Sequence, residues 1–328
     1  MATGVIAAVE GGRLGHEWQK EMLRELLEYQ RSPAAAPARF RRGERRSIRV
    51  RLFAMPTSFR PAPLVALLAG RAAPLAGALA AIFVTAATVR AQDVYEIQVY
   101  EYATVPAGKW ALETHLNFTV RGSTATGGPQ YPSQGQMHLT FELTRGLTEH
   151  VELAGYLVTA RREGASPEVV GYRIRPRVRV PKSWNWPLDA GLSLEVGFPD
   201  TKFEEYPMTL EVRPVLEKQF GRLQVDLNPV IGRALKGPGV DAGWDFEPNA
   251  RLGWQLTPSV DLSLEYYGST GNVTNWRPGE QQVHQFYPGF DWQLSEGTVM
   301  NFGVGLPVTN AGDGMIVKMR LGVTFGGK

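Results

Sequence analysis

The feature that most constrains the fold is an alternation of apolar and polar residues that runs from Trp110 to the C-terminus. Successive side chains of a β-strand point to opposite faces, so a period of two predicts strands with one apolar face. Each alternating segment has about the length that a tilted membrane-spanning strand needs. Twelve segments show the pattern: 110–120, 137–143, 151–157, 172–180, 188–196, 208–216, 223–231, 246–256, 260–266, 286–294, 300–306 and 315–325.

The connections between these segments alternate between short and long. The short ones are 144–150, 181–187, 220–222, 257–259 and 295–297. The longer ones are 121–135, 161–169, 199–207, 235–244 and 269–282, and a tighter connection at 309–314 closes the series. Short periplasmic turns and longer outer loops are typical of outer-membrane barrels. The pattern therefore predicts an all-β fold: a transmembrane antiparallel β-barrel of about twelve strands over residues 110–328, with both termini in the periplasm.

Two further features favour a membrane barrel over a soluble β-sandwich, which shows the same alternation. No Asp, Glu, Lys or Arg falls on the apolar parity of the twelve segments, and a charge that faces lipid at mid-depth costs about 2–4 kcal/mol. Aromatic residues also gather near the segment ends, as they do at membrane interfaces. They are Trp110, Trp184, Trp186, Trp254 and Trp292 near the short connections, and Phe198, Tyr206 and Trp244 near the long ones. A soluble β protein is the alternative.

The first 91 residues have a different character. Residues 72–89 form an uncharged run rich in Ala and Leu, and Val89-Arg90-Ala91 then places small residues where signal peptidase requires them. We expect residues 55–91 to be a signal peptide cleaved between Ala91 and Gln92, with an uncleaved membrane anchor as the alternative. Residues 1–54 are interpreted as a mis-assigned start or a disordered extension. Residues 92–109 are interpreted as a periplasmic lead-in or a plug segment, because a thirteenth strand would break the parity.

Charge and composition exclude several classes of function. Residues 1–91 hold 14 Lys and Arg against 6 Asp and Glu, which leaves 21 Lys and Arg against 26 Asp and Glu from Gln92 onward. This part of the chain is therefore acidic, and nucleic-acid binding is not expected. The chain has no cysteine, which excludes disulfides and thiolate metal sites. No cofactor-binding, metal-binding or catalytic motif occurs around His115, His138, His150 or His284, so neither a cofactor nor a metal is expected. Because His284 lies on the outward parity, an outer-membrane lipid hydrolase is kept as a remote alternative to a non-enzymatic barrel.

The polar parity of the twelve segments carries many charges, and in a barrel it faces the lumen. Four arginines occupy successive positions of the polar parity in one segment, at every second residue: Arg173, Arg175, Arg177 and Arg179. The other charges are Glu113, Glu142, Glu152, Asp189, Glu195, Glu211, Arg213, Glu217, Asp226, Glu247, Arg251, Asp261, Glu265, Asp291, Lys318 and Arg320. They could pair into a network that fills a narrow lumen, since buried charges need partners. They could equally set a transverse field across an aqueous pore.

Five prolines lie within predicted strands on the apolar parity: Pro176, Pro214, Pro229, Pro248 and Pro288. Proline cannot donate to a strand ladder, and a closed barrel has no edge strand to accommodate it. The prolines are interpreted either as bulges that shape the barrel or as a lateral weak point through which an apolar solute leaves the lumen for the membrane.

Five segments of the sequence carry a resemblance to known proteins: 94–101 (VYEIQVYE), 105–118 (VPAGKWALETHLNF), 175–181 (RPRVRVP), 227–230 (LNPV) and 264–269 (LEYYGS). Together they resemble a group of outer-membrane β-barrels allied to the "MetA-pathway of phenol degradation" family. The resemblance implies a membrane barrel that passes hydrophobic or aromatic compounds, and it carries over no catalytic or binding residue. Such barrels often end on an aromatic residue that the assembly machinery recognises, whereas Phe325 is followed here by three more residues.

The expected function is passive transport of small or hydrophobic solutes across the bacterial outer membrane. The alternative is a structural barrel whose lumen is closed by its own charges. The expected partners are outer-membrane lipid, lipopolysaccharide, the barrel-assembly machinery and a small solute.

Overall fold

The computed structural model describes residues 93–124 and 130–327, so the expected signal peptide and its cleavage site lie outside the described residues. In these residues three short 3₁₀-helices, η2 (Lys182–Trp184), η3 (Val240–Ala242) and η4 (Gly279–Gln281), accompany the strands. Within the described part of the chain, no helix has the length and apolar character needed to cross a bilayer. The strands are β1 (Trp110–Arg121), β2 (Met137–Thr148), β3 (Val151–Arg161), β4 (Glu168–Arg179), β5 (Asp189–Pro199), β6 (Met208–Phe220), β7 (Leu223–Lys236), β8 (Asp245–Thr257), β9 (Val260–Ser269), β10 (Gly271–Asn272), β11 (Asn275–Trp276), β12 (Val283–Ser295), β13 (Thr298–Pro307) and β14 (Met315–Phe325).

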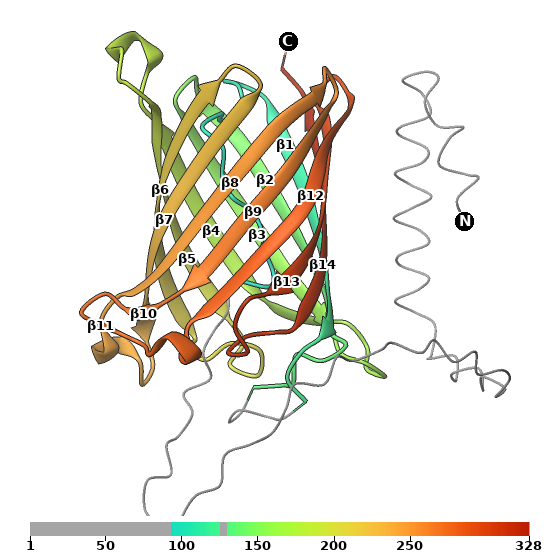
Figure 1. The fold of residues 1–328 in the computed structure, drawn as a ribbon, viewed down its shortest axis with the longest axis vertical. Coiled ribbons are helices and arrows are strands. Elements are labelled where there is room, and N and C mark those ends of the chain that lie inside the picture. Colours follow the sequence, from blue (N-terminus) through green and yellow to red (C-terminus); the bar gives the residue numbers. More distant parts are fainter. Residues whose placement is uncertain (1–92, 125–129, 328) are drawn as a thin grey trace, which may run out of the picture. The chain divides into compact units, whose positions relative to one another are not determined.

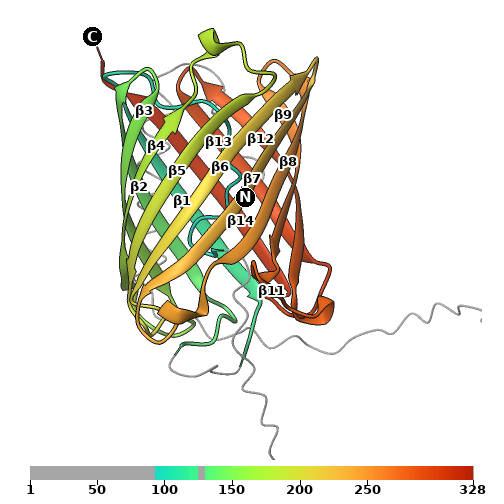
Figure 2. The ribbon, with the colours of Figure 1, turned by 90° about the vertical axis from the view of Figure 1, so that its left-hand side faces the viewer.

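Twelve of these strands form a closed antiparallel barrel (Figures 1 and 2). Strands β1 to β9 pair in chain order, β12 pairs with β9, and β14 pairs back with β1 to close the wall. Strands β10 and β11 pair with each other in a small hairpin, and β10 also pairs with β8. The predicted twelve-stranded antiparallel barrel is therefore confirmed, and each alternating segment corresponds to one strand.

The two ends of the barrel differ in their connections. Four of the connections at one end are two-residue turns, between β2 and β3, β6 and β7, β8 and β9, and β12 and β13. Gly221 and Gly297 lie in two of these turns with φ values of 61° and 78°, the left-handed conformation that tight hairpins require. Strand β1 begins and β14 ends at this short-turn end, where Trp110 pairs with Phe325. That the short-turn end faces the periplasm stays a prediction.

The outer face of the wall is apolar. Leu153, Tyr172, Ile174, Leu252 and Leu262 are all more than 40% exposed, and similar side chains continue around the strands. A band of this extent is unfavourable in water but is what a barrel presents to lipid. Four exposed tryptophans lie toward the short-turn end: Trp110, Trp184, Trp186 and Trp254. Another exposed tryptophan, Trp276, lies on β11 in the long connection between β9 and β12. The fold is a transmembrane β-barrel.

Candidate functional site in the barrel lumen

Residues 93–105, called here the plug segment, lie inside the barrel, where the backbone bonds to side chains of the wall. Asn228 on β7 is fully buried and makes two of these bonds. Its Nδ2 donates to the carbonyl oxygen of Tyr100 at 3.0 Å, and its Oδ1 accepts from the Tyr100 N–H at 2.6 Å. The other wall residues bonded to the plug backbone are Asn117, Glu152, Arg177, Arg213, Glu217 and Lys318. The closed wall has no free strand edge with which the plug backbone could pair, so side chains of the wall provide the hydrogen-bond partners of that backbone.

Apolar contacts also hold the plug segment, on two sides. Tyr95 packs with Ala154, Tyr156, Val158, Ala160 and Val170 on the inner face of β3 and β4. Ile97 and Val99 pack with Tyr267, Tyr287 and Ile316 on the inner faces of β9, β12 and β14. All three plug side chains are at most 4% exposed. The plug segment therefore spans the lumen between opposite parts of the wall.

The arginines of β4 lie on its inward face, and carboxylates surround them. Arg175 contacts Glu142 on β2, and its Nη1 lies 2.7 Å from Oε1 of Glu152 on β3. Arg177 lies 3.6 Å from the same oxygen of Glu152. Arg173 contacts Asp93 of the plug segment and lies 3.2 Å from Glu195 on β5. Arg179, nearest the short-turn end, donates to the backbone carbonyl of Glu149 at 2.8 Å. Arg173, Arg175 and Arg177 therefore bind the wall and the plug segment instead of facing open water, whereas Arg179 is half-exposed.

Most of the other predicted lumen charges also form ion pairs. Arg320 binds Glu113 at 2.7 Å, and Lys318 binds Glu265 at 2.5 Å. Arg251 binds Asp226 at 3.1 Å and Asp291 at 2.7 Å. Arg213 binds Glu211 at 2.7 Å, and Asp189 pairs with Lys182 of η2 at 3.0 Å near the short-turn end. Glu247 is half-buried on β8.

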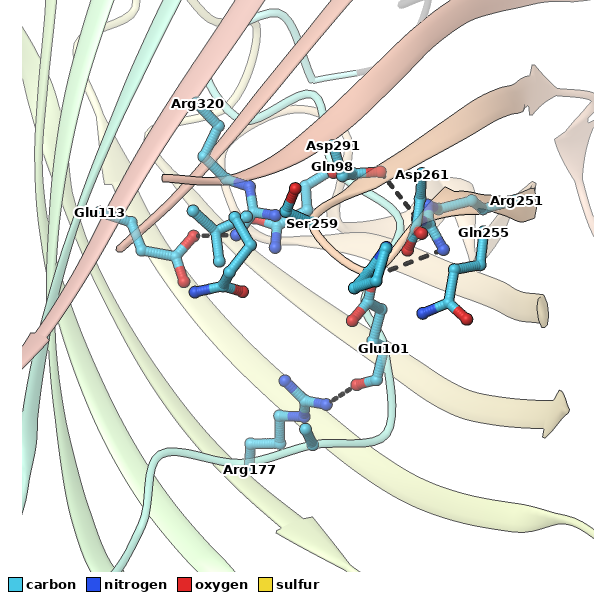
Figure 3. A pocket seen from close by; sticks show the side chains of 14 residues that line it. Gln98, Glu101, Glu113, Arg177, Arg251, Gln255, Ser259, Asp261, Asp291 and Arg320 are labelled. Atoms are coloured by element: carbon cyan, nitrogen blue, oxygen red, sulfur yellow. Dashed lines mark hydrogen bonds and ion pairs between the residues drawn. The ribbon is translucent and has the colours of Figure 1, made fainter. Parts of the chain in front are cut away.

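A polar cavity of about 310 Å³ lies between the plug segment and the short-turn end of β8, β9 and β12 to β14. Figure 3 shows Arg320 with Glu113 on one side of it and Arg251 with Asp291 on the other. Glu101 of the plug segment lies 3.4 Å from Arg251 and links the plug to this wall. The remaining charged lining residues are Arg177 and Asp261. A cavity of this size and charge can hold water or a small polar solute.

The loops at the opposite end are tied to one another. The Ser133 hydroxyl in the β1–β2 loop donates to the Asp313 carboxylate in the β13–β14 loop at 2.5 Å. Burial raises the pKa of Asp313, and the hydrogen bond from Ser133 opposes that shift. The Tyr131 ring contacts Phe203 of the β5–β6 loop, and the Arg162 guanidinium lies 3.7 Å from the Tyr131 ring centroid.

Three of the strand ladders have a gap in their pairing at a proline. Between β6 and β7 the pairing runs to Val212 with Ile231 and resumes at Leu216 with Leu227, which leaves out Pro214 and Pro229. The β4–β5 ladder is interrupted at Pro176 and the β12–β13 ladder at Pro288. Pro229 and Pro248 are register partners on β7 and β8. The missing N–H of proline explains these gaps.

Sequence reasoning missed two of the residues that hold the plug. Asn228 and Asn117 are uncharged, so a search for charges on the inward parity passes over them. An uncharged amide at the middle of an inward face was the available signal, since buried polar groups need partners. His284 bonds to the Tyr266 hydroxyl at 2.7 Å and to the Gln282 amide oxygen at 3.2 Å. Within the described residues its ring has no serine partner, so this geometry gives the hydrolase alternative no support.

No protein-family model matches the chain, and no curated protein sequence does. Solved structures of similar fold include an outer-membrane channel from Pseudomonas putida F1, with 9% identity and a TM-score of 0.45. The match covers 70% of this chain and 100% of that one. The porin KdgM has 10% identity and a TM-score of 0.40 over 66% of this chain and 99% of its own. LpxR from Salmonella typhimurium has 12% identity and a TM-score of 0.35, and the match covers 66% of this chain and 100% of LpxR.

Proposed function

We propose that this protein is a bacterial outer-membrane channel for passive passage of small solutes, with a lumen closed by the plug segment. The observation that carries the proposal is how the plug is held. Its backbone bonds to wall side chains and not to a strand ladder. A segment held in this way can leave without breaking the barrel, because the twelve-strand ladder closes independently of it.

The lining of the lumen indicates the class of solute that could use an axial path. Arginines and carboxylates from several strands surround the cavity, and such a lining favours small polar or charged solutes over apolar ones. A hydrophobic solute would need the lateral route at the interruption between Pro214 and Pro229. The two routes therefore predict different solutes.

The alternative is a barrel that conducts nothing. The paired charges and the plug segment favour it, because together they fill much of the lumen. Under this alternative the charges stabilise the barrel from inside, and displacing the plug serves no function.

Single-channel recording of the refolded, processed protein in planar bilayers distinguishes the proposed channel from the non-conducting barrel. We expect a stable open level whose ion selectivity changes when Arg175 and Arg177 are both replaced by Glu. A swelling assay on proteoliposomes with small sugars and amino acids would then rank the solutes. Silence at all salts and voltages, together with no swelling, would support the structural barrel.

A further inference from the structure

Three potential metal ligands from three separate segments meet inside the lumen. They are Glu96 of the plug segment, His115 on β1 and Glu142 on β2, which are 3%, 1% and 2% exposed. One ligand atom from each residue lies within 4.8 Å of the other two. His115 and Glu142 share the inward face of paired strands, where Thr140 is the register partner of His115. The plug segment adds Glu96 to this pair.

The histidine side chain is the second observation that points to a ligand. Nε2 of His115 is buried and has no hydrogen-bond partner among the described residues. It lies 3.6 Å from Oε2 of Glu142, too far for a hydrogen bond. A buried polar atom without a partner is costly. By contrast, two ligands at about 2.0–2.2 Å from one tetrahedral metal lie roughly 3.3–3.6 Å apart, close to the separation found here.

The charge on Glu96 is also poorly neutralised by its nearest arginine. Arg173 lies 3.7 Å from Oε2 of Glu96, and the same guanidinium is nearer to Asp93 and to Glu195. The other oxygen of Glu96 accepts from the Tyr100 hydroxyl at 2.5 Å, which leaves the charge in place. A buried carboxylate needs a compensating cation, and a divalent ion between Glu96, His115 and Glu142 would provide one.

We propose that Glu96, His115 and Glu142 bind a divalent metal ion of the zinc type, and that this ion ties the plug segment to β1 and β2. One imidazole and two carboxylates suit Zn²⁺ better than Ca²⁺ or Mg²⁺, which prefer oxygen ligands alone. A second group, formed by Asp93, Glu96 and Glu195, offers only carboxylates and shares Glu96. The histidine therefore decides which metal the lumen selects.

Zinc alone is the probe. The folded, processed protein is equilibrated with ZnCl₂, dialysed against metal-free buffer and assayed for metal per chain by mass spectrometry, with titration calorimetry for affinity. We expect about one zinc per chain. Loss of an outer-shell partner alone costs about 10–100-fold in metal affinity, so we expect His115→Gln and Glu96→Gln each to weaken binding at least about tenfold. Substituted Co²⁺ should give visible absorption bands that both variants lose.

His138→Gln is the matched control. His138 is an equally buried histidine on β2 whose ring contacts the plug residue Tyr95 and whose Nε2 is bonded to Gln136 at 3.0 Å. Its Nδ1 also has no hydrogen-bond partner among the described residues, but within them His138 belongs to no group of three potential metal ligands. We expect this variant to keep wild-type zinc affinity. Because Glu96 lies outside the strands, Glu96→Gln leaves the wall intact, and heat-modifiable gel mobility checks the folding of every variant. The proposal is overturned if the wild type holds no stoichiometric zinc, if His115→Gln binds it normally, or if His138→Gln loses it equally. Calcium binding that depends on Glu195 and not on His115 would also overturn it.

Discussion

Replacing Asn228 by Leu should release the plug segment. The side chain is fully buried and bonds both to the N–H and to the carbonyl of Tyr100, at 2.6 Å and 3.0 Å. Leucine has nearly the same size, so the packing survives while both backbone groups lose their partners. Each buried group left without a partner costs about 1–3 kcal/mol, so the plugged state should lose about 2–6 kcal/mol relative to the displaced one. Since about 1.4 kcal/mol is a factor of ten, the displaced population should rise at least roughly 30-fold.

The absence of cysteine from the chain provides the assay. A Val99→Cys reporter replaces a plug side chain that is 4% exposed and packed against the wall. A charged maleimide that cannot cross the membrane should label it in proportion to the time the plug spends displaced. The labelling rate is therefore expected to rise about 30-fold or more when Asn228→Leu is added. This measurement does not depend on whether the barrel conducts.

Asn249→Leu is the control for this experiment. Asn249 is the register partner of Asn228 on the inner face of β8, and no bond to the plug segment is found for it among the described residues. Asn117→Leu, which removes one bond to the Val94 carbonyl at 2.8 Å, should give an intermediate rate. Equal labelling in the Asn228→Leu and Asn249→Leu proteins would show that these hydrogen bonds do not hold the plug.

Three further predictions concern the outer face of the wall, the signal-peptide cleavage site and the prolines. Ile174→Arg, at an outward position that is 53% exposed, should lower the free energy of unfolding in lipid by about 2–4 kcal/mol, and an unchanged urea midpoint would reverse the assignment of the two faces. Intact mass of outer-membrane material should give a chain that starts at Gln92, whereas an inner-membrane chain that starts near Met1 would contradict the cleavage site. Cysteines at the register partners Val212 and Ile231, beside the ladder gap, should block uptake of a hydrophobic solute on oxidation and restore it on reduction. A crosslink between Leu112 and Leu143, on a continuous ladder, should have no effect, and uptake indifferent to both crosslinks would leave the prolines as bulges.

Much of the fold could be predicted because it follows from a local period. A side chain two residues along a strand returns to the same face, so Ile174 was placed outward and Arg175 inward without knowledge of any neighbour. The turns were predictable for a similar reason, since Gly221 and Gly297 stand where a two-residue hairpin needs a positive φ. The ladder gaps at Pro176, at Pro214 with Pro229, and at Pro288 were predictable because the missing N–H is a property of the residue itself. The β7–β8 ladder, by contrast, runs unbroken through Pro229 and Pro248.

The sequence by itself determined which residues share a face, but only the tertiary structure decided which of them meet. Arg175 pairs with Glu142 and Glu152 because β2, β3 and β4 are neighbours in one particular register. The route of residues 93–105 through the lumen depends on contacts with β4, β6, β7 and β14, which lie between 70 and more than 200 residues further along the chain. The Glu96, His115 and Glu142 group has no sequence motif for the same reason. Face is set by the backbone over a few residues, whereas a site inside a closed barrel is set by strand register and by the segment that the barrel encloses.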